Sequence, residues 1–325
     1  MSIKAPLRPA PGERPDVLIA VVTYNSAGLI ERFLRALPAA LTGAGTATVV
    51  VVDNDSADGT PDLVRTLAPW VDVVEPGANR GYGAGINVAL RHTRARRGVY
   101  VLNPDAVPSP GSVARLAQAV EDHPDVGIAV PRIVDRAGRL KFSLRREPTI
   151  RRALGEAVLG GHRAARFTAW GDMIRDAEYY ADGARADWAT GAAMFLAPRT
   201  LDAVGQWEED YFLYSEETDY ALRARDVGLH VRLVGDADVV HPGGDMSVSP
   251  WLWSLVAVNR TRLYRRRHGA VAGSVYWLIV LLNEGSRSLL GRPTHRAAVR
   301  ALIRGARDVP RSPQPAAPLA AARRS

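Results

Sequence analysis

The alternation of apolar, β-branched runs with helix-like segments constrains the fold of the first 125 residues more than any other feature. Apolar runs occur at 16–25, 47–55, 71–76 and 98–106, and segments such as 27–41 and 83–97 have helical composition. Strands that start about 25–30 residues apart, separated by helices, are typical of βαβ units and a parallel sheet. Because the runs are apolar throughout, we expect both faces of this sheet to be buried.

Polar residues gather where the predicted strands end. Those that follow the first, second and fourth runs are Thr23, Tyr24, Asn25, Asp53, Asp55, Asn103 and Asp105. In open α/β sheets ligands bind outside the carboxyl ends of the strands. Asn, Asp and Pro also favour turns, but three strand ends with the same composition favour a binding site.

Two of these carboxylates differ in what they predict. Asp53 directly ends a buried strand, where a carboxylate can accept hydrogen bonds from a ribose or a base. Ligand binding and turn formation explain Asp55 equally well. We assign Asp58 to the turn and the helix cap.

The glycine-rich stretch "GANRGYGAGIN" (77–87) does not indicate a dinucleotide site. Its glycines at 81, 83 and 85 leave Ile86 where a G-x-G-x-x-G motif needs glycine, and it follows the third strand. We interpret it as a loop that meets a ligand and enters a helix, with Arg80 free to contact a phosphate or base.

The stretch "LNPDAVP" (102–108) offers Asp105 with Asn103 two positions earlier. Hard cations such as Mg²⁺ are held by one or two carboxylates together with substrate phosphates. A turn built by Asn103, Pro104 and Asp105 explains the same residues equally well.

A second acidic group lies in "YFLYSEETDYALRARDVGLHV" (211–231), where Glu216, Glu217 and Asp219 follow Ser215. Ser215 suits an N-cap, and acidic residues in a first turn complement the helix dipole. A helix start explains one or two of the three carboxylates, which leaves a chemical role open for the rest.

The positive charge is concentrated at the C-terminal end. The net charge of the chain is +8. Residues 251–325 contain 14 arginines and only two acidic residues, Glu284 and Asp308. The apolar stretch 270–282 is shorter than the roughly 20 residues that span a bilayer, so we predict a helix that lies on an anionic membrane surface. A buried helix is the alternative, and nucleic-acid binding is disfavoured because no recognised module is present.

We predict a disordered leader (1–15), one α/β domain (16–248, with halves 16–125 and 126–248), a basic helical region (249–308) and a disordered tail (309–325). Within the second half of the domain we predict a strand pair at 229–241, ending at His241. The chain contains no cysteine, which excludes disulfides, thiolate metal sites and a cysteine nucleophile. The leader has no apolar core, so we expect no signal peptide and a cytoplasmic protein.

The motifs in order are Thr-Tyr-Asn, "VVDNDSADGT", "NRGYGAGIN", "LNPDA", "TGAAMF", "YFLYSEETDYALR" and "HPGGDMS". Over about residues 16–245 the chain resembles the family 2 inverting glycosyltransferases, closest to bacterial rhamnosyltransferases and galactofuranosyltransferases of cell-wall and polysaccharide assembly. The resemblance implies a GT-A fold, Rossmann-like and mostly parallel, together with a nucleotide-sugar donor and a divalent cation, Mg²⁺ or Mn²⁺.

Carried over by position, the resemblance implies a donor site and a metal site. Thr23, Tyr24, Asn25 and Asp53 would line the nucleoside pocket, with Arg80 nearby. Asp105 falls on the last Asp of the family's Asp-x-Asp metal motif. Asn103 replaces the first, which removes one anionic contact. His241 matches a histidine that completes the metal site in related transferases, although a strand-end histidine needs no such role.

For the acceptor side, the resemblance implies that the acidic group supplies the general base. We predict Glu217 as the base, Glu216 as a helper that holds the acceptor, and Asp219 in structural or acceptor contacts. The segment "ATGAAMF", with Thr190 and Gly191, resembles the one under the acceptor site. Trp188 either stacks on a sugar or packs in the core.

We therefore expect an inverting transferase that moves L-rhamnose from dTDP-rhamnose to a lipid-linked or polysaccharide acceptor at the inner face of the cell membrane. A galactofuranosyl or other hexosyl transferase that uses a UDP-sugar is the alternative, and a non-catalytic nucleotide-sugar-binding protein is a second. The oligomeric state is left open, homo-oligomers included.

Overall fold

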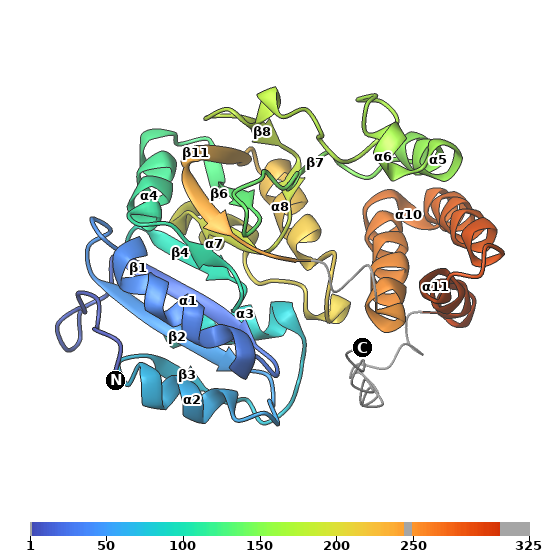
Figure 1. The fold of residues 1–325 in the computed structure, drawn as a ribbon. Helices are drawn as coiled ribbons and strands as arrows, with labels where there is room; N and C mark the ends of the chain where they lie inside the picture. Colours follow the sequence, from blue (N-terminus) through green and yellow to red (C-terminus); the bar gives the residue numbers. More distant parts are fainter. Residues whose placement is uncertain (1, 244–248, 306–325) are drawn as a thin grey trace.

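The computed structural model describes residues 2–243 and 249–305, and its centre is one mixed, mostly parallel sheet (Figure 1). The order is β3-β2-β1-β4-β10-β6-β11-β5, with β8 paired to β11 beside this path. Its strands are β1 (Val17–Thr23), β2 (Ala47–Asp53), β3 (Asp72–Val74), β4 (Gly98–Leu102), β5 (Val107–Pro108), β6 (Val126–Val134), β8 (Arg185–Ala186), β10 (Ala193–Leu196) and β11 (His230–Val240). The four strands predicted from apolar runs pair in parallel, as expected.

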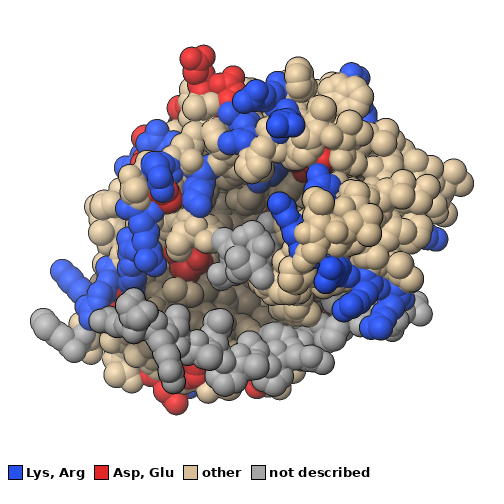
Figure 2. Space-filling model, turned by 45° about the vertical axis from the view of Figure 1, so that its right-hand side comes forward, with Lys and Arg blue, Asp and Glu red and all other residues tan. Residues whose placement is uncertain are grey.

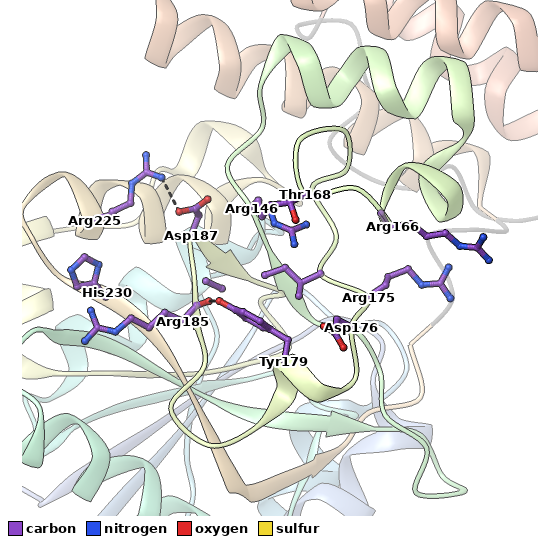
Figure 3. Close-up of a pocket in the computed structure, with 13 residues that line it drawn as sticks. Arg146, Arg166, Thr168, Arg175, Asp176, Tyr179, Arg185, Asp187, Arg225 and His230 are labelled. Carbon is purple, nitrogen blue, oxygen red and sulfur yellow. Dashed lines mark hydrogen bonds and ion pairs between the residues drawn. The ribbon is translucent and has the colours of Figure 1, made fainter.

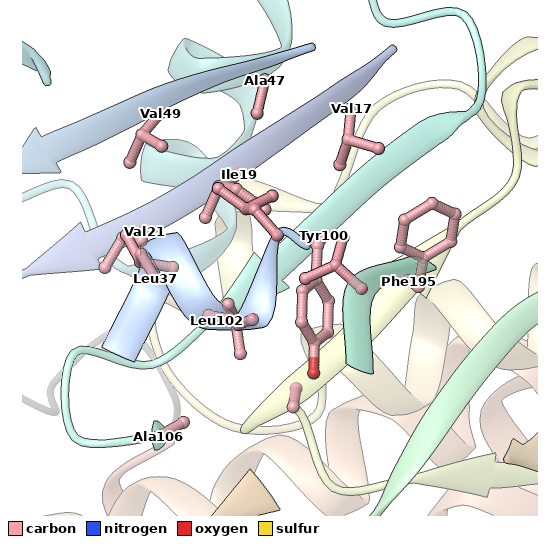
Figure 4. Packing of buried hydrophobic residues seen from close by; sticks show 14 of the residues in the cluster. Val17, Ile19, Val21, Leu37, Ala47, Val49, Tyr100, Leu102, Ala106 and Phe195 are labelled. Carbon is pink, nitrogen blue, oxygen red and sulfur yellow. The ribbon is translucent and has the colours of Figure 1, made fainter. Parts of the chain in front are cut away.

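Helices cover both faces of the sheet (Figure 1). They are α1 (Ala27–Ala40), α2 (Thr60–Leu67), α3 (Tyr82–His92), α4 (Ser112–Asp122), α7 (Pro198–Val204) and α8 (Glu216–Asp226), with the 3₁₀ turn η2 (Glu209–Tyr211). Every residue of β1, β2 and β4 is buried, because α1 and α4 pack on one face while α3 and α8 pack on the other. Figure 4 shows the first of these cores, with Val17, Ile19 and Val21 of β1 and Leu37 of α1.

Residues 144–189, within the second half of the domain, form a smaller layer beside the sheet. It contains the strand pair β7 (Leu144–Arg145) and β9 (Trp188–Ala189), the helices α5 (Ile150–Leu159) and α6 (Gly161–Ala164), and the 3₁₀ turn η1 (Glu178–Tyr180). The sequence predicted a strand pair ending at His241, but the structure has one irregular strand there, β11. Its register shifts next to Val231 and between Val234 and Asp238.

The C-terminal region consists of α10 (Pro250–Ser288) and α11 (Pro293–Arg304), in agreement with the predicted helices. Gly269 interrupts α10 with a φ of 82°, a conformation that glycine adopts without strain, so the helix turns there. Within the described ranges, no helix is both long and apolar enough to cross a bilayer.

The sequence predicted a disordered leader and a disordered tail, and the structure describes only the first of them. Residues 2–15 contain no helix or strand, but they are not a free leader. Ile3 is buried and its carbonyl accepts a hydrogen bond from Trp70 Nε1, while the carbonyl of Leu7 accepts one from Ala47 N. The expected tail, 309–325, lies outside the described residues.

Candidate active site

The ends of β1 and β2 hold a carboxylate in a fixed position. Because Thr23 and Asp53 are register partners, Thr23 Oγ1 donates to Asp53 Oδ1 at 2.7 Å. Ser56 completes the arrangement, since its N donates to Asp53 Oδ2 and its Oγ to Oδ1. Asp53 is only 1% exposed, so its orientation is set before any ligand arrives.

The loops after these strands are built from residues that tolerate left-handed backbone. Asn25 and Asp55 have φ values of 50° and 65°, and Asn and Asp adopt this region more readily than other non-glycine residues. Asn25 Oδ1 accepts from Ala57 N at 2.9 Å, which ties the two loops together. Tyr24 is 37% exposed beside them.

Asp58 joins the two loops, in the structural role assigned to it from the sequence. Its carboxylate accepts hydrogen bonds from Ala27 N at the start of α1 and from Thr60 N and Oγ1 at the start of α2. Burial opposes the charge, but the bonds from Thr60 and Ala27 outweigh it and lower the pKa of Asp58.

The loop before α3 approaches the acidic group that begins α8. The carbonyl of Gly81 accepts from Asn54 Nδ2 at 3.0 Å, and Tyr82 N donates to the carbonyl of Phe212 at 2.7 Å. A Cβ on Gly81 would lie 2.2 Å from that carbonyl oxygen, so only glycine fits this approach. Arg80 is exposed and pairs with Glu209 at 3.2 Å.

Tyr82 marks where the predicted residues meet. Its hydroxyl donates to the carbonyl of Gly191 at 3.1 Å, although the two residues are 109 positions apart. Burial, and then the charges of Glu216, Glu217 and Asp105, raise the pKa of Tyr82 well above its ordinary value. The three carboxylates therefore act on one half-buried phenol, which the sequence prediction did not include among the site residues.

Asp105 and His241 come together from distant parts of the chain. His241 Nε2 lies 3.3 Å from Asp105 Oδ1, and both side chains are about one-fifth exposed. Asn103 forms the turn before Asp105, since its carbonyl accepts from Ala106 N and its own N donates to Ala192 O. Over residues 2–243 and 249–305 no cluster of three or more His, Cys, Asp or Glu side chains is placed to hold a metal.

The segment 211–219, called here the acidic segment, has an unusual backbone. Phe212, Tyr214 and Ser215 all have φ between 63° and 78°, a region that costs a bulky residue about 1–2 kcal/mol. Ser215 therefore points away from the N-cap geometry predicted for it, and its side chain makes no capping bond. Packing around the segment must offset this strain.

The adjacent glutamates Glu216 and Glu217 have different environments. Glu216 is 3% exposed and its Oε2 has no hydrogen-bond partner within the described chain. Burial, and then the charge of Glu217, raise the pKa of Glu216 well above its ordinary value. Burial also raises the pKa of Glu217, but backbone amides at the start of α8 and the charge of Arg145 act against this rise. Glu217 is more accessible and is the one suited to carry the negative charge.

The remaining acceptor-side predictions lie along β9 and α8. A Cβ on Gly191 would lie 3.2 Å from Glu217 Cβ, so the two residues are in close contact. Asp219 pairs with Arg223 at 2.7 Å, which is a structural contact within the helix. Trp188 Nε1 donates to Arg146 O at 2.9 Å, and Arg145 lies 5.9 Å from the centre of its ring. Thr190 N donates to Ser143 O in the same layer.

The C-terminal region supports the acidic segment through Asn259, a residue that the sequence prediction missed. Its Nδ2 lies 2.7 Å, 2.8 Å and 3.2 Å from the carbonyl oxygens of Tyr211, Leu213 and Tyr214. Asn259 is 3% exposed, and its neighbour Arg262 binds the carbonyl and carboxylate of Asp210. The position of Asn259 directly after the apolar run "LVAV" (255–258) was the available signal.

Comparison with known proteins adds independent information. Residues 18–176 match the sequence model of Glycosyl transferase family 2. An N-acetylglucosaminyl-diphospho-decaprenol L-rhamnosyltransferase of Mycobacterium tuberculosis is 30% identical over 237 residues, which cover 70% of this chain and 76% of that protein. A low-salt glycan biosynthesis hexosyltransferase of Haloferax volcanii is 25% identical over 237 residues, covering 70% and 67%.

Among solved structures, a mannosyltransferase of Pyrobaculum calidifontis in complex with GDP-Man and Mn²⁺ superposes with a TM-score of 0.53. The match covers 90% of this chain and 81% of that chain at 20% identity, a level that supports the fold alone.

Proposed function

The chain belongs to glycosyl transferase family 2 and is a glycosyltransferase with a GT-A fold, as its sequence predicted, and from this premise we propose that it transfers one sugar with inversion from a nucleotide-sugar to a saccharide acceptor. The observation that carries the proposal is the convergence of Glu216, Glu217 and Asp105 around Tyr82 at the carboxyl edge of the sheet. Ligands of open α/β sheets bind at this edge.

Glu217 is the general base in this proposal. An acceptor hydroxyl attacks the anomeric carbon of the donor, the new glycosidic bond forms, and the bond to the nucleoside diphosphate breaks on the opposite face. Glu217 takes the hydroxyl proton as the bond forms. Glu216, whose raised pKa favours the protonated form, is suited to donate a hydrogen bond to the acceptor.

The donor lies over the ends of β1 and β2 in this proposal. Thr23, Tyr24, Asn25 and Asp53 line the nucleoside pocket, and Asp55 and Arg80 are at its margin. Asp53 supports this role best, because Thr23 and Ser56 hold its carboxylate in place. Asn103 and Asp105 follow at the end of β4, next to the diphosphate.

Asp105 and His241 are a suitable but incomplete ligand set for a divalent cation. A carboxylate and an imidazole 3.3 Å apart supply two ligands. Mg²⁺ in nucleotide sites typically takes one or two carboxylates and completes its shell with phosphate oxygens and water. A bound Mg²⁺ or Mn²⁺ supplies positive charge that stabilises a leaving diphosphate.

We assign L-rhamnose from dTDP-rhamnose as the sugar, with a galactofuranosyl or other hexosyl transfer from a UDP-sugar as the second candidate. Support for rhamnose comes from the identity with the mycobacterial rhamnosyltransferase. Because the name of that relative specifies a diphospho-lipid acceptor, we propose a diphosphate-linked lipid saccharide as the acceptor here.

We further propose that the C-terminal region rests on the anionic inner face of the cell membrane. Val271, Val275, Leu278 and Leu282 recur at helical spacing along α10 and are 45–83% exposed. The opposite face of the same helix buries Tyr276, Ile279 and Val280. The predicted buried helix thus describes this face, and the proposed interfacial helix describes the exposed face. The side of the molecule that carries these helices is broadly uncharged with basic side chains at its edge (Figure 2), which suits an interfacial helix.

The test is turnover of a panel of dTDP-, UDP- and GDP-sugars, with and without Mg²⁺ or Mn²⁺, in the presence and absence of a diphospho-lipid acceptor. We expect release of one nucleoside diphosphate that needs a divalent cation, and a product of inverted anomeric configuration. Turnover of a UDP-hexose in preference to dTDP-rhamnose would replace the rhamnosyl assignment. Retention of configuration would contradict the single displacement.

A further inference from the structure

A basic cavity of about 710 Å³ lies beside the proposed acceptor site and has no role in the mechanism above. Its wall comes from the loop after α6, from the strand β8, and from the end of α8 and the start of β11. The basic residues that line it are Arg146, Arg166, Arg175, Arg185, Arg225 and His230. Figure 3 shows Arg146 between the Arg225–Asp187 pair on one side and Arg166 and Arg175 on the other.

Carboxylates neutralise only part of this charge. Arg225 pairs with Glu147 at 2.7 Å and with Asp187 at 3.1 Å, and Arg185 pairs with Asp125. Within the described ranges, Arg146, Arg166 and Arg175 form no ion pair with a carboxylate. Asp176, the other acid in the wall, accepts a hydrogen bond from Glu178 N. The cavity therefore keeps an excess of positive charge.

Arg146 is the most enclosed of the three arginines that have no carboxylate partner. It is half-buried, and its Nη1 reaches two backbone carbonyls, those of Gly171 and Met173, at 3.3 Å each. Burial, and then the charge of Arg152, lower the pKa of Arg146. The charges of Asp172 and Asp187 oppose this shift, but neither carboxylate pairs directly with Arg146. A partly buried guanidinium with no carboxylate in direct contact is costly, and an anion with two or more oxygens matches its planar fork.

The cavity lies between two features of the proposed acceptor path. On one side Ala186 and Asp187 of its wall lead directly to Trp188, whose Nε1 binds Arg146 O, and then to Thr190, Gly191 and Glu217. On the other side, the loop that carries Arg166 and Thr168 also exposes two aromatic side chains, Phe167 at 55% and Trp170 at 38%. The exposed apolar surface, the basic cavity and the proposed sugar site thus lie one after another along this path.

We propose that this cavity binds the diphosphate of the lipid-linked acceptor, with the lipid leaving past Phe167 and Trp170 and the sugar pointing to Glu217. The assignment rests on the proposed function. Arg146 supplies a bidentate contact at the base of the cavity, and Arg166 and Arg175 supply the remaining charge at its rim.

The experiment measures the affinity of the full-length chain for farnesyl diphosphate, with the nucleoside diphosphate of its donor present at saturation so that the donor site is filled. Arg146→Ala and the double variant Arg166→Ala/Arg175→Ala are compared with wild type. Arg91→Ala is the matched control, because Arg91 is an exposed arginine of α3 outside the cavity. The double variant removes exposed side chains only, so its folding is not at risk.

We expect each cavity variant to weaken farnesyl diphosphate binding about tenfold or more, as the loss of charge-assisted hydrogen bonds predicts, and Arg91→Ala to leave it unchanged. Farnesol, which lacks the diphosphate, should bind all four proteins equally. Equal affinity of the cavity variants and wild type for farnesyl diphosphate, or no binding to wild type, would overturn the proposal.

Two further measurements separate this proposal from its neighbours. If the cavity variants lose binding to phosphatidylglycerol vesicles but keep their affinity for farnesyl diphosphate, the cavity binds a membrane headgroup and the acceptor assignment fails. Donor turnover in wild type tests the proposed function independently, because it does not involve the cavity. Intact donor turnover with unchanged farnesyl diphosphate affinity in the variants would reject this inference alone.

Discussion

The strand-end loops (residues 23–26 and 53–60) and the acidic segment are both bent sharply, but different contacts hold them. In the strand-end loops the left-handed residues are Asn25 and Asp55, whose side chains suit that backbone. In the acidic segment the left-handed residues are Phe212, Tyr214 and Ser215. The two aromatic side chains are poorly suited to that backbone.

The supporting hydrogen bonds differ in the same way. Thr23, Ser56 and Thr60 of the strand-end loops bond to Asp53 and Asp58 of the same loops. The acidic segment is held from outside, by Asn259 of α10 and by the Gly81 loop. The geometry of the proposed nucleotide site is therefore a local property of its loops, whereas the geometry of the proposed base depends on the C-terminal helices.

The largest effect should come from Glu217→Gln, which removes the proposed base and keeps the shape of the acidic segment. We expect the rate of sugar transfer to fall about 10²–10⁴-fold, the range for general acid–base catalysis. Donor affinity and the thermal midpoint should stay close to wild type. Glu31→Gln, at an exposed glutamate of α1, is the control, and equal losses in the two variants would argue against a catalytic role.

Gly81→Ala should break the contact between the Gly81 loop and the acidic segment. The new Cβ would lie 2.2 Å from the backbone oxygen of Phe212, at a φ of 94°. We expect the free energy of unfolding to fall by about 2–4 kcal/mol, measured by denaturant titration. Gly77→Ala is the matched control, since its φ is 77° but nothing lies within 4 Å. A similar loss in both would mean that φ strain, and not the contact, explains the effect.

Asn259→Ala should show whether the C-terminal region positions the base. The change leaves the carbonyls of Tyr211, Leu213 and Tyr214 without their donor, so the acidic segment should move. We expect kcat to fall about tenfold or more while the KM for the donor is unchanged, because misplaced catalytic groups lose rate steeply. Ser254→Ala on the same helix is the control, since Ser254 Oγ donates to Pro250 O of that helix and not to the acidic segment. Parallel changes in kcat and donor KM would contradict a specific positioning role.

The pH dependence of transfer tests the electrostatics of the same segment. Burial raises the pKa of Glu217, so the active, deprotonated form should appear above the ordinary glutamate range of about 4.3. The rate should increase with pH through that raised value. Arg145→Met removes a positive charge that lowers the pKa, so the acidic limb of kcat/KM should move to higher pH. A shift to lower pH would show that Glu217 is not the titrating group.

Ser56→Ala should have the smallest effect, because the strand-end loops are redundantly bonded. Asp53 loses the hydroxyl of Ser56 but keeps Thr23 Oγ1 and the Ser56 amide. The change also removes the acceptor of Asn25 N, but that bond is exposed and water can replace it. We expect a loss of about 1 kcal/mol in the free energy of unfolding and a donor KM within a few-fold of wild type. A loss in donor affinity as large as that of Asp53→Asn would contradict the redundancy.

Much of the fold, and the gathering of polar residues at the strand ends, was predictable from the sequence. Buried parallel strands need continuous apolar, β-branched runs, and their polar ends must face a common edge, so β1, β2 and β4 could be located in advance. The pairing of Thr23 with Asp53 follows from the same alternation. The roles assigned to individual site residues remain predictions for the experiments above.

Tertiary structure decided the rest. Local pattern carries no information on distant residue pairs such as Tyr82 and Gly191, 109 positions apart. The family resemblance, and not the local pattern, placed Asp105 and His241 in one site. The local pattern also predicted Ser215 as an N-cap and residues 229–241 as a strand pair, and both predictions were wrong. Sequence propensity does not reflect contacts made by another helix or by a shifted partner strand. Sequence by itself determined the chemistry of the side chains and the period of the strands. Packing of α10 and the Gly81 loop against a strained backbone determined where Glu216 and Glu217 point, because only distant contacts can offset that strain.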